Sequence, residues 1–156
     1  MRRPVVLDGH VHCGAWSPER EGWPGATLEE VQDALSRSGI DGAVFLPTDV
    51  ADNEGLLATL TPRLAHHYFF PWVDPHEPAK MMDFLERRAV EIDGLKIHPS
   101  LERLRVDDAG WRPFLEYAER RRLPVVVHSG RWQEMSSSSI SASRVVKSWK
   151  IRVASS

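Results

Sequence analysis

Short apolar runs alternate along the chain with segments whose apolar residues recur every three or four positions. Most of these runs are continuous, which is typical of parallel strands covered on both faces. The five runs lie at residues 5–7, 43–46, 68–73, 95–97 and 125–127. The segments between them indicate helices, and each strand–helix repeat spans about 30 residues. This order predicts a parallel α/β sheet, either open or closed into a barrel.

Local signals mark the ends of the predicted helices. Thr27 and Glu30 have the spacing of a capping box, in which each side chain satisfies a backbone N–H group at the helix start. Gly39 is suited to end this first helix. Pro78 fits the first position of the third helix, and Pro124 prevents the fourth helix from continuing.

Composition excludes several classes of protein. The chain has 156 residues, of which 42% are hydrophobic and 27% charged, as expected for one globular domain. A net charge of -2 gives no reason to expect nucleic acid or an anionic membrane as partner. No apolar run approaches the roughly 20 residues that cross a bilayer. The single cysteine, Cys13, fits a reducing compartment, so we expect a cytoplasmic protein.

The composition changes abruptly near residue 135. Residues 136–156 contain nine serines, and no Asp or Glu follows Glu134. The sequence therefore predicts two parts. Residues 1–134 form the α/β part, and residues 135–156 form a Ser-rich basic tail that is disordered or foreign to the fold.

Polar and ionisable residues collect where the apolar runs end. They are Asp8, His10 and His12 after the first run, Lys96 and His98 at the fourth, and His128 after the fifth. Because the carboxyl ends of parallel strands meet at one edge of the sheet, we expect a binding or catalytic site at this edge.

A divalent metal is the first ligand that these residues suggest. His10 and His12 are two positions apart, so both imidazoles point to one face of an extended chain. His128 is a third donor from another strand, and Asp8 can orient a ligand by hydrogen bonding. Histidines with a purely structural role are the alternative. Three histidines suit several divalent ions.

Lys96 and His98 share a face of the fourth strand, and two roles are open for each of them. A lysine inside a barrel is costly unless it is paired or chemically modified. Lys96 is therefore either a metal ligand or the partner of Asp8 or Asp49 in a salt bridge. His98 either donates a hydrogen bond to a substrate carboxylate or caps its strand.

These motifs together resemble the amidohydrolase superfamily, most closely its amidohydrolase-related branch of hydrolases and nonoxidative decarboxylases. Residues 8–12, 94–99 and 124–130 carry the resemblance, which extends from about residue 5 to residue 134. It implies a (β/α)₈ TIM-type barrel with a metal, often zinc, at the C-terminal mouth. His10, His12 and His128 would bind this metal. Lys96 is the candidate equivalent of a strand-four lysine that is carboxylated and bridges two metals in some members.

The resemblance also implies an activity, and it shows that two residues of the family pattern are missing from this sequence. The metal would lower the pKa of a bound water to about 7, for hydrolysis of an amide, ester or lactone, or would assist loss of CO₂ from a carboxylated substrate. The family has a further His after strand six and an Asp after strand eight, often the general base. No His follows His128 here, and no Asp follows Asp108.

The length points the same way, since a complete barrel takes about 250 residues. We therefore expect an incomplete barrel of about five βα units from a truncated or frame-shifted family member, with the general base beyond the chain end.

Two other functions stay open at this point. One is a non-catalytic α/β fragment that needs a partner chain to fold. The other is a TatD-like nuclease or a phosphoesterase, although phosphate chemistry generally recruits more cationic groups. If the chain is a metal-dependent hydrolase or decarboxylase, we expect a small-molecule substrate. An incomplete barrel leaves strands one and five with open edges, which favours a homo-oligomer.

Overall fold

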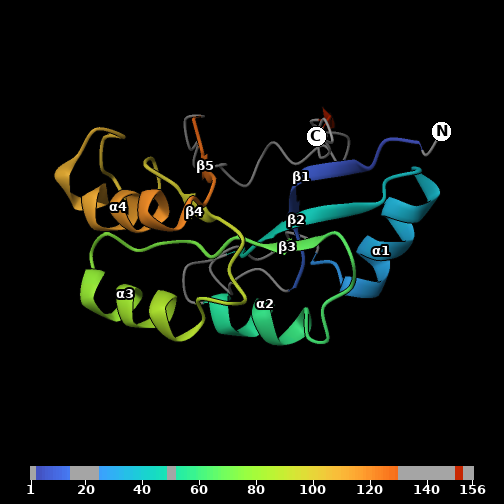
Figure 1. The fold of residues 1–156 in the computed structure, drawn as a ribbon, viewed down its shortest axis with the longest axis horizontal. Coiled ribbons are helices and arrows are strands. Elements are labelled where there is room, and N and C mark those ends of the chain that lie inside the picture. The colour runs from blue at the N-terminus through green and yellow to red at the C-terminus, as the bar shows by residue number, and fades with distance from the viewer. Residues whose placement is uncertain (1–2, 15–24, 49–51, 130–149, 153–156) are drawn as a thin grey trace, which may run out of the picture.

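Strands and helices alternate in the predicted order (Figure 1). The structure is a computed structural model that describes residues 3–14, 25–48, 52–129 and 150–152. Its elements are β1 (Val6–His12), α1 (Leu28–Arg37), β2 (Gly42–Leu46), α2 (Asn53–Thr59), β3 (His67–Phe69), α3 (Pro78–Arg87), β4 (Leu95–Ile97), η3 (Ala109–Trp111), α4 (Arg112–Arg121), β5 (Val125–Val127) and β6 (Lys150–Arg152). None of the described helices has the length and apolar character needed to cross a membrane.

The strands β1 to β5 run parallel and lie side by side in chain order. β2 pairs with both β1 and β3, and β4 pairs with β5. A single bridge between Trp72 and Lys96 joins the two sheets. There the Lys96 N–H donates to the Pro71 carbonyl (2.8 Å), and the Val73 N–H donates to the Lys96 carbonyl (3.0 Å). The sheet does not close, so the fold is a partial barrel of parallel α/β type, as predicted.

The helix ends follow from local side-chain chemistry. Glu30 N–H donates to Thr27 Oγ1 (3.2 Å) and Thr27 N–H donates to Glu30 Oε2 (2.8 Å), which confirms the capping box at the start of α1. Pro78 is the first residue of α3, where its missing N–H costs nothing. α4 ends at Arg121, and the capping residue Arg122 adopts a left-handed conformation with φ of 55°, two residues before Pro124.

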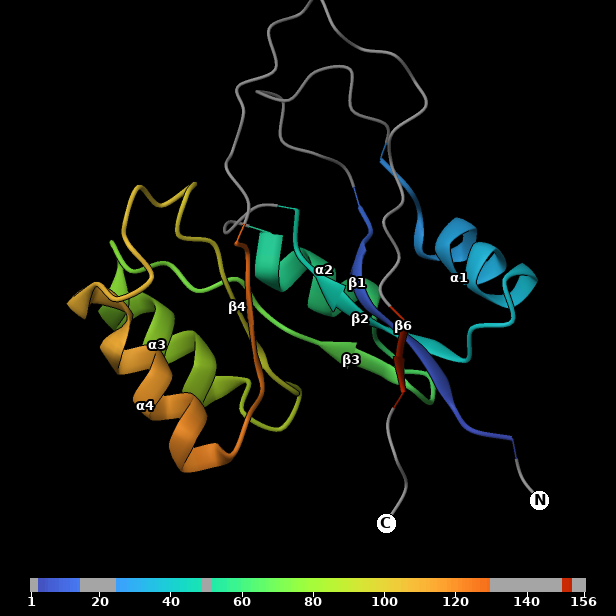
Figure 2. The ribbon, with the colours of Figure 1, turned by 90° about the horizontal axis from the view of Figure 1, so that it is seen from above.

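The core lies between the strands and the helices that cover them. α1 and α2 lie on one side of the β1–β2–β3 sheet, whereas α3 and α4 lie next to each other beside β4 and β5 (Figures 1 and 2). Tyr117 of α4 joins the last two helices by donating its hydroxyl to the Leu85 carbonyl (2.9 Å). The large side chains buried in this core include Phe45, Phe69, Leu95, Trp111 and Phe114.

β3 is shorter than its apolar run predicts. The run covers residues 68–73, but the strand ends at Phe69 and the chain continues as an irregular extended segment. Pro71 explains the difference, because it has no N–H to donate to a strand ladder. The segment after β3 is thereby left to pair with β4 at only one bridge.

Only three residues of the Ser-rich tail are described. They form β6, which pairs antiparallel with β1 in the register Leu7 to Ile151. β6 therefore covers the edge of β1 that the sequence led us to expect open. The other edge, that of β5, has no paired strand among the described residues. The rest of the tail lies outside these residues, so its disorder and the homo-oligomer stay predictions.

Gly42 at the start of β2 offers a test of how closely the strands are packed. A Cβ atom at this position would overlap the carbonyl oxygen of His66, which belongs to the backbone entering β3. We expect Gly42→Ala to lower the free energy of unfolding by about 1–3 kcal/mol, because the backbone must shift. Urea unfolding followed by circular dichroism measures this loss.

Gly55→Ala is the matched control for this substitution. Its Cβ would meet only the side chain of Asp52, which can move, and alanine favours a helix such as α2 by about 1 kcal/mol over glycine. A Gly42→Ala protein as stable as the wild type would contradict the close approach of these two strands.

Candidate functional site

The Asp8–His12 motif forms the C-terminal part of β1 and contains an irregularity. The pairing register with β2 shifts between Asp8 and Val11, as in a β-bulge, a feature that re-aims side chains next to functional sites. Asp8 Oδ1 accepts a hydrogen bond from the backbone N–H of His10 (3.0 Å). Asp8 therefore supports the backbone of the motif, and its predicted role in orienting a ligand stays a prediction.

His10 and His12 lie together, as their spacing predicts, with their Nε2 atoms 3.0 Å apart. The Nδ1 atom of His12 lies 3.0 Å from the carbonyl oxygens of both Leu46 and Pro47 at the end of β2. Carbonyl oxygens only accept, so Nδ1 of His12 carries the proton and Nε2 carries the lone pair. A carbonyl behind the distal ring nitrogen is the usual support of a metal-binding histidine.

The spacing of this pair fits a metal ion. Two imidazole nitrogens bound to one tetrahedral zinc at about 2.0–2.1 Å lie roughly 3.3 Å apart. The observed separation of 3.0 Å between the Nε2 atoms of His10 and His12 is close to that value. The donors of β1 therefore suit a single divalent cation.

Lys96 is buried at the centre of the site without a partner. It lies on β4 with 1% of its surface exposed, and its Nζ atom makes no hydrogen bond to the described residues, Asp8 included. Asp49, the other partner considered for it, lies outside the described residues. Burial lowers the pKa of Lys96 to about 8. An orphaned buried amine of this kind requires an anion, a metal or a covalent modification to offset its desolvation.

His98 and His128 form a second pair, next to β4 and β5. Their rings stack at a centroid distance of 3.9 Å, and His98 also stacks on Trp72 at 5.0 Å. His98 is 4% exposed, and its Nδ1 atom accepts from the Leu101 N–H (3.3 Å), so its proton lies on Nε2. One ring nitrogen of His98 thus caps the turn after β4, and the other is a hydrogen-bond donor.

His128 does not converge with the β1 pair in this structure. Among the described residues, one group of three or more His, Cys, Asp or Glu brings its ligand atoms within 4.8 Å of one another, and it consists of Asp74, His76 and Glu102. The structure therefore brings together His10 with His12, and separately His128 with His98.

Electrostatic interactions nevertheless connect these groups. Limited hydration of the ring lowers the pKa of His10 to about 3, with further contributions from the charges of Lys96, His12 and His128. The pKa of His128 is also lowered, mainly because the ring is partly buried and to a lesser extent because of the charge of Lys96. Both histidines are consequently neutral at pH 7, the form in which imidazole binds a metal. We call Lys96 with His10, His12, His98 and His128 the histidine–lysine cluster.

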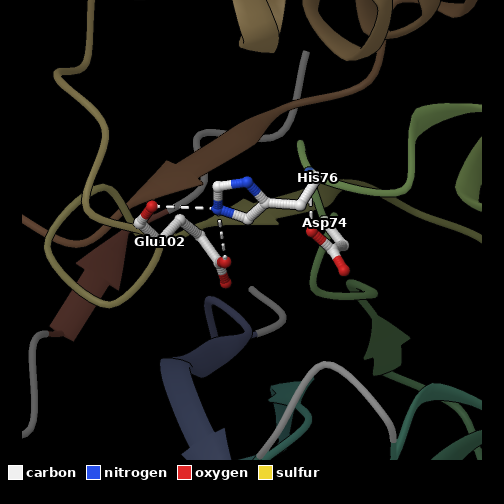
Figure 3. Close-up of side chains that lie close together, drawn as sticks. All are labelled: Asp74, His76 and Glu102. Atoms are coloured by element: carbon white, nitrogen blue, oxygen red, sulfur yellow. Dashed lines mark hydrogen bonds and ion pairs between the residues drawn. The ribbon is translucent and has the colours of Figure 1, made fainter.

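The Asp74–His76–Glu102 group combines one residue pair at a strand end with a residue that sequence reasoning missed (Figure 3). Asp74 and His76 follow the third apolar run, which is a recognisable signal. Glu102 lies in the loop after β4, where no periodicity or motif distinguishes it from other acidic residues.

Comparisons with known proteins agree with this fold. The model of the amidohydrolase family matches residues 8–152, so the chain belongs to this family and the predicted resemblance is confirmed. Among solved structures, it is similar to a probable 2-pyrone-4,6-dicarboxylic acid hydrolase from Acinetobacter baumannii with citric acid bound. That similarity has a TM-score of 0.59 at 15% identity, and covers 80% of this chain and 49% of the other.

This chain therefore spans about half the length of that structure. No curated protein gives a significant match to the sequence. Members of this family typically depend on a metal.

The unpaired Lys96 predicts an unusual effect on stability. We expect Lys96→Met, measured with EDTA present, to raise the free energy of unfolding at pH 7 by about 1–4 kcal/mol, because a buried charge without a partner is replaced by an apolar side chain. Lys80→Met is the control, since Lys80 is exposed and pairs with Glu77 (2.7 Å). Thermal unfolding of the three proteins checks this.

The difference in unfolding free energy between Lys96→Met and the wild type should depend on pH in a defined direction. The unfolded chain binds the Lys96 proton up to a pKa near 10.4, whereas the folded chain releases it near pH 8, so wild-type stability rises with pH across this window. The advantage of Lys96→Met should be largest below pH 8 and shrink towards pH 10.5. A variant less stable than wild type at pH 7 would show that Lys96 has a counter-charge.

Proposed function

We propose that this protein acts in the metal-dependent hydrolysis of a carboxylated small molecule, with nonoxidative decarboxylation as the related reaction of the same centre. One observation carries the proposal: neutral histidines and the unpaired Lys96 gather at the carboxyl ends of β1, β4 and β5. In parallel α/β barrels this edge is where catalytic groups lie. Membership of the amidohydrolase family supports the same reaction class.

We propose zinc as the metal, bound first by Nε2 of His10 and His12. Lys96 and His128 are the neighbouring groups that would complete the site, His128 after its ring leaves the stack with His98. Lys96 would act as the neutral amine or as its adduct with CO₂, and its lowered pKa favours both forms. When bound, such a metal polarises the substrate carbonyl and supplies a hydroxide at neutral pH.

The protein groups would select an anionic substrate. The Nζ atom of Lys96 has no partner among the described residues, so a negatively charged ligand would compensate its charge. His98 can donate from Nε2 to a substrate carboxylate, because its Nδ1 already accepts from the backbone. The similar solved structure is named for a pyrone dicarboxylic acid and holds citric acid, which makes carboxylated lactones the first compounds to test.

We also place the protein in the cytoplasm. Its single cysteine, Cys13, is buried in the core, and burial together with the charge of Asp52 raises the pKa of the thiol to about 11. A thiol of this kind has a packing role and forms no disulfide within the chain.

Zinc affinity and lactone hydrolysis together test the proposed centre. The double variant His10→Ala/His12→Ala should lose the zinc bound at β1, with an affinity loss of about 100-fold or more. Zinc-dependent hydrolysis of a carboxylated lactone should be lost with it. A chelating dye measures the zinc, and the absorbance of the lactone measures the reaction.

His66→Asn is the matched control for this experiment. His66 is an exposed histidine outside the cluster, and its φ of 63° is one that asparagine tolerates. Zinc binding and hydrolysis should be unchanged in this variant. Zinc binding and hydrolysis that both survive in the double variant would refute the assignment of His10 and His12.

A further inference from the structure

A second cluster of metal-ligating groups lies outside the histidine–lysine cluster. Asp74 and His76 come from the loop between β3 and α3, and Glu102 comes from the loop after β4 (Figure 3). One ligand atom from each residue lies within 4.8 Å of the other two. The group therefore joins two loops that are separate in sequence, at the same end of the strands as the proposed active site.

A hydrogen bond from Trp72 holds the side chain of Glu102 in place. Its Oε1 atom accepts a hydrogen bond from the indole N–H of Trp72 (2.9 Å), and the side chain is only 13% exposed. The other carboxylate oxygen, Oε2, faces Nε2 of His76 at 3.6 Å. Pre-orientation of this kind lowers the entropy cost of binding a ligand.

Oxygen atoms converge on one nitrogen of His76. Its Nε2 atom lies 3.0 Å from the backbone carbonyl of Glu102, in addition to the carboxylate oxygen at 3.6 Å. Asp74 holds the backbone of the same loop, since its Oδ1 accepts from the His76 N–H (2.8 Å). Because carbonyl oxygens only accept, Nε2 of His76 carries a proton in the absence of an ion. A cation bound at Nε2 would replace this proton, with the ring proton then on Nδ1, and would share the oxygen atoms of Glu102.

The surroundings leave room for an ion to enter. The His76 side chain is 57% exposed. An ion at the cluster would thus be reached from solvent without unfolding either loop.

We propose that Asp74, His76 and Glu102 bind a divalent cation of the zinc or manganese type, at a site separate from the histidine–lysine cluster. Carboxylates and imidazole suit such ions, whereas calcium takes oxygen ligands alone. This inference does not rest on the proposed function. The cation would hold the loop after β3 against the loop after β4.

The site has a structural link to the proposed active centre. Glu102 bonds Trp72, Trp72 stacks on His98, and His98 stacks on His128. A cation at Glu102 would therefore stabilise the position of the Trp72 ring against which His98 packs. Its role would be to position residues of the centre, with no contact to the reacting atoms.

Zinc titration of a protein that lacks the β1 donors tests this proposal. His10→Ala/His12→Ala should still bind Zn²⁺, and adding His76→Ala should weaken the remaining affinity by about 100-fold or more. Asp74→Asn should act in the same direction, because the amide oxygen keeps the hydrogen bond to the His76 N–H but loses the charge. Circular dichroism confirms folding, and Asp74→Asn decides the outcome if His76→Ala does not fold.

Asp83→Asn supplies the matched control, since Asp83 is an exposed carboxylate on α3 that pairs with Arg87 (2.8 Å) outside the cluster. When Asp83→Asn is added to the double variant His10→Ala/His12→Ala, the zinc affinity should equal that of the double variant alone. The proposal is overturned if the double variant binds no zinc, if both cluster substitutions leave its affinity unchanged, or if Ca²⁺ binds as tightly as Zn²⁺. Loss of all zinc in the double variant alone would still support the centre proposed at His10 and His12.

Discussion

The backbone of Lys96 holds the two sheets of this fold together. Its N–H and carbonyl pair with the irregular segment after β3, while β4 as a whole pairs with β5. Pro71 limits the strand pairing on the β3 side to one bridge, and the Asp93 N–H adds a hydrogen bond to the Phe69 carbonyl (3.0 Å). The same pairing fixes the Lys96 side chain inside the partial barrel. Lys96 therefore serves both the fold and the site, because the strand that links the two sheets also introduces a buried charge.

The buried amine determines the electrostatic character of its neighbours. A positive charge at Lys96 lowers the pKa of both His10 and His128, in addition to the effect of limited hydration. The histidines are kept neutral and the lysine becomes easier to deprotonate, so the cluster offers lone pairs at a pH where free lysine offers none. Such an arrangement costs stability in the absence of a ligand, which is common at functional sites. The cost is itself an argument that the cluster binds something.

Sequence reasoning succeeded where the deciding interaction is short-range. The capping box at Thr27 involves one helical turn, and the approach of His10 to His12 requires only the two-residue period of a strand. Contacts between distant residues could not be read in this way. The stack of His98 on His128 depends on the pairing of β4 with β5, and Glu102 approaches the loop after β3 because Trp72, 30 residues away, binds its carboxylate. β6 and the bulge in β1 also depend on pairing between residues that are distant in the sequence, so the sequence alone did not predict them.

The two candidate cation sites differ in charge, and this difference has a consequence for selectivity. The histidine–lysine cluster consists of neutral and positive groups, whereas Asp74 and Glu102 bring two carboxylates to the other site. A free divalent ion is attracted to the carboxylates first, since their charge compensates its own. Trp72 lies between the two clusters, because it donates a hydrogen bond to Glu102 and stacks on His98 of the histidine–lysine cluster. Occupation of the acidic site would remove negative potential near Trp72 and His98, which would make the histidine–lysine cluster more attractive to an anionic substrate.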